Sequence, residues 1–206
     1  RLIYGDTQAS PFPPNFLHKP SFNLWFRNDY GQSNVKYPLL GDDYPVRSFE
    51  QFRVRAGKND ALNPFIRDEL VRRLYHDMGQ ESSLGRINTL YINGRFKGFY
   101  NLCERLREPF MQKHHDSEEE WDVRQVRSIE NGDGLAWNEL KARLAQDLDV
   151  EDNWEAVLEY IDPIAIADYY LLNIYAATWD WPNNNWVAAR ERSADGRFQF
   201  YVYLQC

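Results

Sequence analysis

Residues 87–104 read INTLYINGRFKGFYNLCE, in which two runs of apolar and aromatic residues flank the pair Asn93-Gly94. An Asn-Gly pair readily adopts the positive φ angles of a tight two-residue turn, and the twist of that turn matches the twist of the strands on either side. The stretch therefore predicts a β-hairpin, with strands over residues 87–92 and 96–104.

The chain before this hairpin alternates strands and loops around one helix. Residues 21–27 (SFNLWFR) and 51–55 (QFRVR) alternate apolar and polar side chains, which is typical of strands. The run 63–79 predicts a helix, because Asn63 suits the N-cap, Pro64 suits the first helical position and apolar residues recur at every fourth position. The first half is therefore rich in sheet.

The chain after the hairpin becomes helical. Residues 135–148, 154–161 and 163–179 each carry apolar residues at helical spacing, and Asp162-Pro163 supplies an N-cap followed by a first-turn proline. The last of these helices is nearly apolar on every side, so it is expected to run through the middle of its lobe. Sheet followed by helices predicts an α+β fold.

The predicted second half ends on strands. Residues 186–190 and 197–204 are strand-like and are joined across the turn Asp195-Gly196. Two cysteines are too few for a disulfide framework or a zinc site, and Cys103 is expected to be a small buried residue. The run 114–120 (HHDSEEE) is interpreted as a flexible surface loop rather than a metal site, because its histidines lack helical i, i+4 spacing.

Bulk composition excludes several classes of protein. The chain has 206 residues, 43% of them hydrophobic and 16% aromatic, which is enough for one substantial core that can be divided into two lobes. Its net charge is -7 and no block of lysine or arginine accompanies the aromatic residues, so nucleic acid is not an expected partner. No apolar run reaches the roughly 20 residues of a membrane span, so none is expected in this segment.

The loop 179–185 (WDWPNNN) is the most informative polar segment. Asp180 and Asn185 stand in a D-x-x-x-x-N spacing, in which a carboxylate can orient an attacking hydroxyl and an amide oxygen can bind magnesium during phosphoryl transfer. Asp, Asn and Pro are also ordinary turn residues. The spacing alone therefore leaves a catalytic loop and a structural Asx-turn both open.

Several short motifs occur together in one order along nearly the whole chain. They are 18–22 (HKPSF), 55–60 (RAGKND), 66–70 (IRDEL), 91–94 (YING), 98–102 (GFYNL) with Glu104, 180–182 (DWP) and 184–186 (NNW). This set resembles the CotH (spore coat protein H) family of atypical protein kinases. No single motif in the set is specific.

The resemblance implies a fold, an activity and a setting. It implies one two-lobed kinase-like domain truncated at both ends, with a sheet-rich N-lobe over about 1–104 and a helical C-lobe over about 105–206. It further implies the use of ATP and Mg²⁺ or Mn²⁺ to phosphorylate serine or threonine hydroxyls of a protein substrate. Proteins of this family are secreted, on the cell surface or in the spore coat.

The resemblance also implies roles for five residues on the nucleotide side. Lys19 would contact phosphate and Glu69 would hold it in an ion pair, whereas an exposed helix pair of Glu69 with a neighbouring arginine is the alternative. Arg55 and Arg67 would bind phosphates or support the site, since a guanidinium suits both roles. Glu104 would touch the adenosine portion or, alternatively, be a solvated charge after a strand.

On the catalytic side, the resemblance makes Asp180 the residue that orients the substrate hydroxyl. Asn185 and Asn184 would be ligands of the metal ion. Two departures from the family pattern weaken a catalytic interpretation. Residues 5–11 (GDTQASP) match the family's G-x-S-R element only in part, with proline in place of the arginine. Leu204 stands where a metal-binding aspartate is expected.

Two other functions remain open on these residues. The departures favour a catalytically impaired pseudokinase that acts as a coat, scaffold or surface-binding module. Glycan recognition through Trp179, Trp181 and Trp186 is a third reading, although tryptophan beside buried helices more often belongs to the core.

Overall fold

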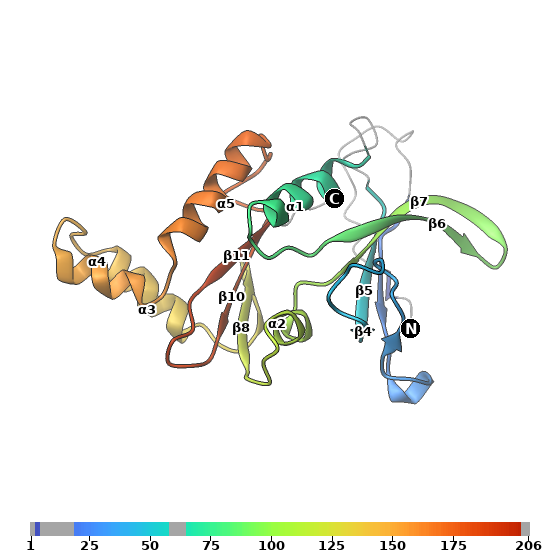
Figure 1. Cartoon of the computed structure of the whole chain (residues 1–206), viewed down its shortest axis with the longest axis horizontal. Coiled ribbons are helices and arrows are strands. Elements are labelled where there is room, and N and C mark those ends of the chain that lie inside the picture. Colours follow the sequence, from blue (N-terminus) through green and yellow to red (C-terminus); the bar gives the residue numbers. More distant parts are fainter. Residues whose placement is uncertain (1–2, 5–18, 58–64, 203–206) are drawn as a thin grey trace. The chain divides into compact units, whose positions relative to one another are not determined.

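The computed structural model of the chain describes residues 3–4, 19–57 and 65–202 (Figure 1). These residues form two compact units. Among them, unit 1 comprises the residues up to Arg73 together with Ser83–Arg105, and unit 2 comprises Leu74–Ser82 together with the residues from Leu106 to Val202. Antiparallel sheets and α-helices are both present, so the fold is α+β as predicted.

Within the described residues, unit 1 is built on a five-stranded antiparallel sheet. Its strand order is β1-β2-β5-β7-β6, and these strands span Ile3–Tyr4, Phe22–Trp25, Gln51–Arg55, Arg95–Glu104 and Gly85–Ile92. The predicted strands over 21–27 and 51–55 are therefore confirmed as β2 and β5. The helix that crosses from unit 1 into unit 2 is α1, Arg67–Asp77. It lies within the predicted run 63–79, whose first two residues fall outside the described ranges.

The predicted hairpin is confirmed as β6 and β7. Asn93 and Gly94 have φ angles of 51° and 74°, which are the positive values that the turn requires. Of β7, only the segment Asn101–Glu104 pairs with β5. The rest of the β6–β7 hairpin therefore extends beyond β5 as a two-stranded ribbon (Figure 1). One face of the sheet carries a core of Phe22, Val54, Ala56 and Tyr100.

A second core cluster in unit 1 forms beside a smaller sheet. β3 (Val35–Lys36) pairs with β4 (Ser48–Phe49), and the short 3-10 helix η1 covers Asn28–Tyr30. The buried members of this cluster are aromatic or β-branched: Tyr44, Val46, Phe49 and Phe52. Sequence analysis did not predict β3 or β4, because two-residue strands give no periodic signal.

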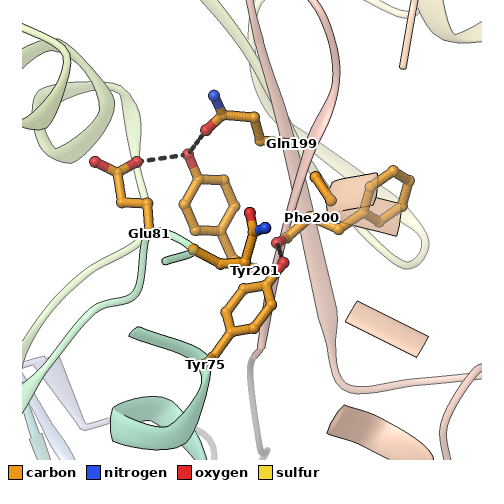
Figure 2. Close-up of a pocket in the computed structure, with 7 residues that line it drawn as sticks. Tyr75, Glu81, Gln199, Phe200 and Tyr201 are labelled. Carbon is orange, nitrogen blue, oxygen red and sulfur yellow. Dashed lines mark hydrogen bonds between the residues drawn. The ribbon is translucent and has the colours of Figure 1, made fainter. Parts of the chain in front are cut away.

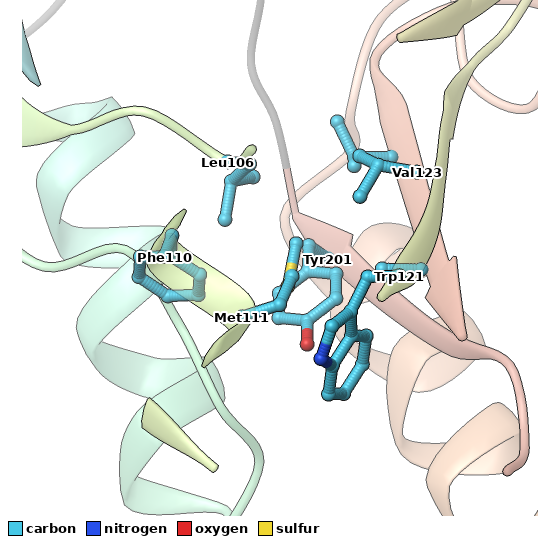
Figure 3. Packing of buried hydrophobic residues seen from close by; sticks show 8 residues of the cluster. Leu106, Phe110, Met111, Trp121, Val123 and Tyr201 are labelled. Carbon is cyan, nitrogen blue, oxygen red and sulfur yellow. The ribbon is translucent and has the colours of Figure 1, made fainter. Parts of the chain in front are cut away.

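Unit 2 is built on a second antiparallel sheet with strand order β11-β10-β8-β9. These strands span Gln199–Val202, Trp186–Glu191, Trp121–Gln125 and Ser128–Asn131. β10 and β11 correspond to the predicted final hairpin, whereas β8 and β9 were not predicted. Figure 3 shows the core that forms where α2 (Glu108–His114) packs beside this sheet, with Met111 between Phe110, Trp121 and Tyr201.

Three helices complete unit 2. They are α3 (Leu135–Leu144), α4 (Glu151–Leu158) and α5 (Pro163–Tyr175), and each overlaps a predicted helix. The predicted cap of α5 is confirmed, because the Asp162 carboxylate accepts hydrogen bonds from the backbone N–H groups of Ile164 and Ala165 at 2.8 and 3.2 Å. A further core cluster, which includes Leu140, Val157 and Phe198, joins these helices to the sheet.

The expectation that α5 runs through the middle of its lobe is wrong. Tyr169, Leu172 and Asn173 are buried, but Ile174 is 66% exposed and Tyr175 82% exposed. The all-round apolar pattern therefore does not mark a helix covered on every side. It marks a helix with one face on β11 and an apolar face that lies open.

The interpretation of 114–120 as a surface loop is also partly wrong. The acidic side chains of this run are exposed, but His114 is the last residue of α2 and both histidines pack into unit 2. His114 stacks on Phe110 at 4.0 Å between ring centroids, and His115 lies 4.7 Å from the ring of Trp121. In the described part of the chain, no group of three or more His, Cys, Asp or Glu residues is arranged to hold a metal ion.

The described part of the chain contains no helix that combines the length and apolar character needed to cross a bilayer. Leu204, the residue at the expected metal-ligand position, lies outside the described residues.

Candidate functional site

The nucleotide-side residues of unit 1 centre on a buried ionic network at the start of α1. Asp68 and Glu69 occupy the first turn of the helix, where carboxylates are favoured by the helix dipole. Asp68 Oδ2 lies 3.0 Å from Arg55 Nε and 2.9 Å from Arg72 Nη2. Glu69 Oε2 lies 3.0 Å from the same Arg72 nitrogen, so one guanidinium bridges both carboxylates.

Glu69 is held on every side by groups of its own unit. Its Oε1 atom lies 2.9 Å from Arg73 Nε and accepts the backbone N–H of Gly85 at 3.0 Å. Its Oε2 atom accepts the amide N–H of Asn101 at 3.0 Å. The alternative of an exposed helix pair is therefore wrong, because the Glu69 carboxylate is buried while Arg73 covers it from the solvent side.

The charges of this network compensate one another. Burial alone lowers the pKa of the Arg72 guanidinium, but the nearby carboxylates of Asp68 and Glu69 outweigh burial and raise that pKa above its ordinary value. A buried charge with such partners stays ionised, whereas removal of one partner leaves the other uncompensated. Arg55, one of the predicted phosphate ligands, thus forms a buried ion pair with Asp68 in this structure.

Lys19 does not pair with Glu69 in this structure. Its ammonium group donates to the backbone carbonyl of Ala56 at 3.0 Å and to that of Phe99, and it lies 4.2 Å from the centre of the Tyr100 ring. Burial lowers the pKa of Lys19, because the charged form loses solvation. Lys19 is therefore bonded to the backbone just after β5 and to that of β7. The Glu69 carboxylate, its expected partner, is bound by other residues.

The remaining predicted residues of unit 1 also have defined places. Glu104 ends β7 and is buried, and its Oε2 accepts the Tyr44 hydroxyl at 2.5 Å. The reading of Glu104 as a solvated charge is thus wrong. Arg67 begins α1 and is half-buried.

In unit 2, Asp180 and Asn185 lie in one tightly wound loop between α5 and β10. Their φ angles are 67° and 63°, in the left-handed region that Asp and Asn tolerate better than most residues. The Asp180 carbonyl accepts the N–H of Asn184 at 2.8 Å, and the Asn185 amide donates to the Trp179 carbonyl at 3.0 Å. The loop therefore presents the exposed Asp180 side chain from a shaped turn.

Aromatic side chains brace the same loop. The Trp181 indole donates to the Tyr169 hydroxyl at 3.0 Å, and the Trp186 indole donates to the Pro182 carbonyl at 3.0 Å. Trp186 also stacks on Trp137 at 5.7 Å. Of the three tryptophans considered for glycan recognition, only Trp179 is largely exposed, so two of them support the loop instead.

A small pocket lies elsewhere in unit 2, beside α1 and β11. Tyr75, Glu81, Gln199, Phe200 and Tyr201 line it (Figure 2). The Tyr201 hydroxyl donates to Glu81 Oε2 at 2.9 Å and lies at the same distance from Gln199 Oε1. The pocket encloses about 200 Å³ including open solvent, which is below the roughly 300–1,000 Å³ of most ligand sites, so it is not a nucleotide pocket.

Residues 14–203 match the family described as CotH kinase protein. The chain belongs to this family. No curated protein matches the sequence.

Membership of the CotH family agrees with the motif set from which the resemblance was drawn. The match begins ahead of Lys19 and runs past Asn185, so every predicted site residue lies inside it. Its last residue precedes Leu204.

Sequence reasoning missed three residues that the structure places in the network: Asp68, Arg72 and Asn101. One local signal was available for two of them, because Asp68 and Arg72 are spaced i, i+4 on a helix. Asn101 reaches Glu69 across 32 residues of chain, and only the pairing of β7 brings it there.

Proposed function

We propose that this CotH-family chain transfers the γ-phosphoryl group of ATP to serine or threonine hydroxyls of a protein. The observation that carries the proposal is the family match over residues 14–203, which includes a shaped loop with an exposed carboxylate at Asp180. In this proposal, units 1 and 2 are the sheet-rich and helical lobes of a kinase-like domain.

The residues divide into two groups of roles. Lys19, together with Arg67, would supply positive charge to the phosphates, and Arg55 and Glu69 would fix α1 against the sheet through Asp68 and Arg72. Glu104 would lie near the adenosine portion. Asp180 would orient the hydroxyl of the substrate and accept its proton, which is the task of a carboxylate in kinase catalytic loops.

The donor atoms of the loop suit a hard cation. Asp180 contributes carboxylate oxygens and the amides of Asn184 and Asn185 contribute neutral oxygens, which is the ligand chemistry of Mg²⁺ and Mn²⁺. A bound divalent ion would neutralise charge on the phosphates. Since the described residues hold no cluster of three acidic, histidine or cysteine ligands, phosphate oxygens and water would complete the coordination shell.

A second function, that of a non-catalytic coat or scaffold protein, is favoured by two observations. Leu204 occupies the expected ligand position in the sequence, and leucine offers no oxygen to a metal ion. Arg55 is bound to Asp68 rather than available at a surface. A scaffold of this kind would keep the ionic network for stability alone.

A phosphate-transfer assay with radiolabelled ATP distinguishes the two functions. The assay uses a serine-rich acceptor protein and compares the parent chain with Asp180→Asn, Leu204→Asp and the combination. Loss of the proton acceptor in Asp180→Asn should lower the transfer rate by about 10²–10⁴ while ATP still binds. Leu204→Asp should strengthen Mg²⁺ binding if the metal shell is incomplete.

Asp195→Asn is the matched control, because Asp195 is an exposed aspartate in the turn before β11. It should leave transfer unchanged. Undiminished transfer by Asp180→Asn would remove Asp180 from the catalytic role. Absence of both ATP binding and transfer in the parent chain and in Leu204→Asp would favour the scaffold function.

A further inference from the structure

The outer face of the β6–β7 hairpin is apolar and open. The cross-strand pairs Tyr91–Phe96 and Thr89–Phe99 put these side chains on one face, opposite the face where Leu90 and Ile92 pack into the core of unit 1. Tyr91, Phe96 and Phe99 are 60%, 54% and 58% exposed. The ring of Phe96 lies between the other two, with its centroid 5.5 Å from that of Tyr91 and 6.1 Å from that of Phe99.

This hairpin is basic in a protein that is acidic overall. Between Gly85 and Cys103 the sequence contains Arg86, Arg95 and Lys97 but no aspartate or glutamate, whereas the whole chain carries a net charge of -7. All three cationic residues are exposed. None of them forms an ion pair with another residue in the described ranges. Their charge is therefore directed outward.

The same hairpin supplies a sheet edge. β6 is the last strand in the order β1-β2-β5-β7-β6, and among the described strands it pairs only with β7. Each edge strand presents a row of backbone N–H and C=O groups to which another strand can bond. Sheet proteins commonly bury or block such an edge, and here an eight-residue strand remains exposed along most of its length.

We propose that the β6 edge and the aromatic face of this hairpin bind an extended, acidic polypeptide segment, which adds to the sheet as a further strand. Backbone bonds to β6 would give the affinity. Carboxylates of the peptide would meet Arg86, Arg95 and Lys97, and its apolar side chains would cover Tyr91, Phe96 and Phe99. This binding does not depend on phosphoryl transfer.

A peptide suits this surface better than other polyanions. Nucleic acids and anionic membranes bind through dense positive charge over a broad area, whereas three cations on an acidic protein give a local attraction only. Neither of these partners uses the backbone groups of a sheet edge. The edge and the aromatic rings together therefore favour an extended peptide.

The experiment measures binding of a fluorescein-labelled ten-residue peptide that alternates glutamate with valine or threonine, at low salt and without ATP. The parent chain should bind it, and a peptide with lysine in place of glutamate should bind at least about tenfold more weakly. Two further peptides carry N-methyl groups on alternate backbone nitrogens in opposite registers. Because an added strand bonds through one edge, one register should abolish binding and the other should retain it.

Two variants test the protein side. Arg95→Glu combined with Lys97→Glu should weaken binding at least about tenfold, and Tyr91→Ser combined with Phe96→Ser should do the same. Lys36→Glu and Tyr37→Ser are matched controls, since both residues are exposed in unit 1 away from the hairpin. These controls should bind as the parent chain does.

Several outcomes would overturn the proposal: no binding of the acidic peptide by the parent chain, equal binding of the lysine peptide, or equal loss from both N-methyl registers. Tighter binding to single-stranded DNA or to vesicles containing phosphatidylserine would replace the peptide with that partner. Asp180→Asn should bind the peptide normally, so a failure of catalysis and a failure of docking are distinguishable.

Discussion

Gly85 donates its backbone N–H to the buried Glu69 carboxylate at 3.0 Å, and no side chain larger than hydrogen fits at this position. A Cβ there would lie 2.3 Å from Asn101 Oδ1, 2.7 Å from Glu69 Oε2 and 2.9 Å from the Leu102 carbonyl. The last of these atoms is backbone and cannot rotate away. The first strand of the hairpin therefore depends on a glycine for packing, since its φ angle lies outside the left-handed region.

Gly85→Ala should destabilise unit 1 by about 1–3 kcal/mol, because overpacking forces the Glu69 network and β7 apart. Urea unfolding measures this change in the free energy of unfolding. Gly134→Ala is the control, as the nearest contact of its added Cβ is the end of the flexible Ile129 side chain at 3.4 Å. A Gly85→Ala chain as stable as the Gly134→Ala chain would contradict the close approach.

Glu69→Ala should lower the free energy of unfolding by about 3–5 kcal/mol, because it leaves Arg72 buried without one of its two carboxylates. Arg73→Ala removes the partner on the solvent side, whose side chain is 52% exposed, and should cost less than about 1 kcal/mol. Comparison of the two urea midpoints tests this asymmetry. Equal losses would mean that the network is not dominated by its buried members.

Lys19→Ala should weaken ATP binding by roughly ten- to a hundredfold, since a charged hydrogen bond to phosphate is worth about 1.5–3 kcal/mol. Titration calorimetry with ATP and Mg²⁺ measures the affinity. Lys97→Ala removes an exposed cation from the same sheet and serves as the control. Unchanged affinity in Lys19→Ala would mean that its bonds to Ala56 and Phe99 serve the fold alone.

The stability of unit 2 should depend on pH through His115. Its Nε2 atom lies 2.9 Å from Glu81 Oε2, and this contact raises the pKa of His115, although burial acts in the opposite direction. Because the folded pKa lies above the unfolded value of about 6.5, the stabilisation is complete below that value. It is lost as the pH rises through the folded pKa.

Thermal unfolding followed by tryptophan fluorescence, at about pH 6 to about pH 9, measures this loss. His115→Gln should be less stable than the parent chain at the acidic end and should flatten the decline. His76→Gln, an exposed histidine late in α1, should reproduce the parent profile. A decline that persists unchanged in His115→Gln would assign the pH dependence to another group.

The parts of the fold with strong local signals were predictable from sequence. The Asn93-Gly94 turn and the Asp162 cap depend on residues next to one another, so their signals survive without tertiary context. α2 was missed because Pro109 and a short apolar pattern give little periodicity. β8 was missed because its five residues, WDVRQ, contain only two apolar side chains, which is too short an alternation to indicate a strand.

The candidate site was predictable in type but not in connectivity. Asp180 and Asn185 share a turn because they are close in sequence. Trp181 and Trp186 support the loop, as expected for tryptophans beside a helix, whereas Trp179 is exposed. Two partners of Glu69, Gly85 and Asn101, could not be predicted, because only the folding of the hairpin strands brings them to its carboxylate. The exposure of α5 was likewise hidden, since composition gives the apolar content of a helix and not the faces that neighbours cover.

Cys103 is buried on β7, an inner strand of the sheet of unit 1, with its thiol 3.7 Å from the Arg53 carbonyl. Of the seven tryptophans, only Trp25 belongs to unit 1. A Cys206→Ser chain would therefore carry a separate optical and chemical reporter for each unit. Indole emission would follow the melting of unit 2, while the rate at which a thiol reagent modifies Cys103 would follow transient opening of unit 1, and a difference between the two would reveal whether the units unfold cooperatively.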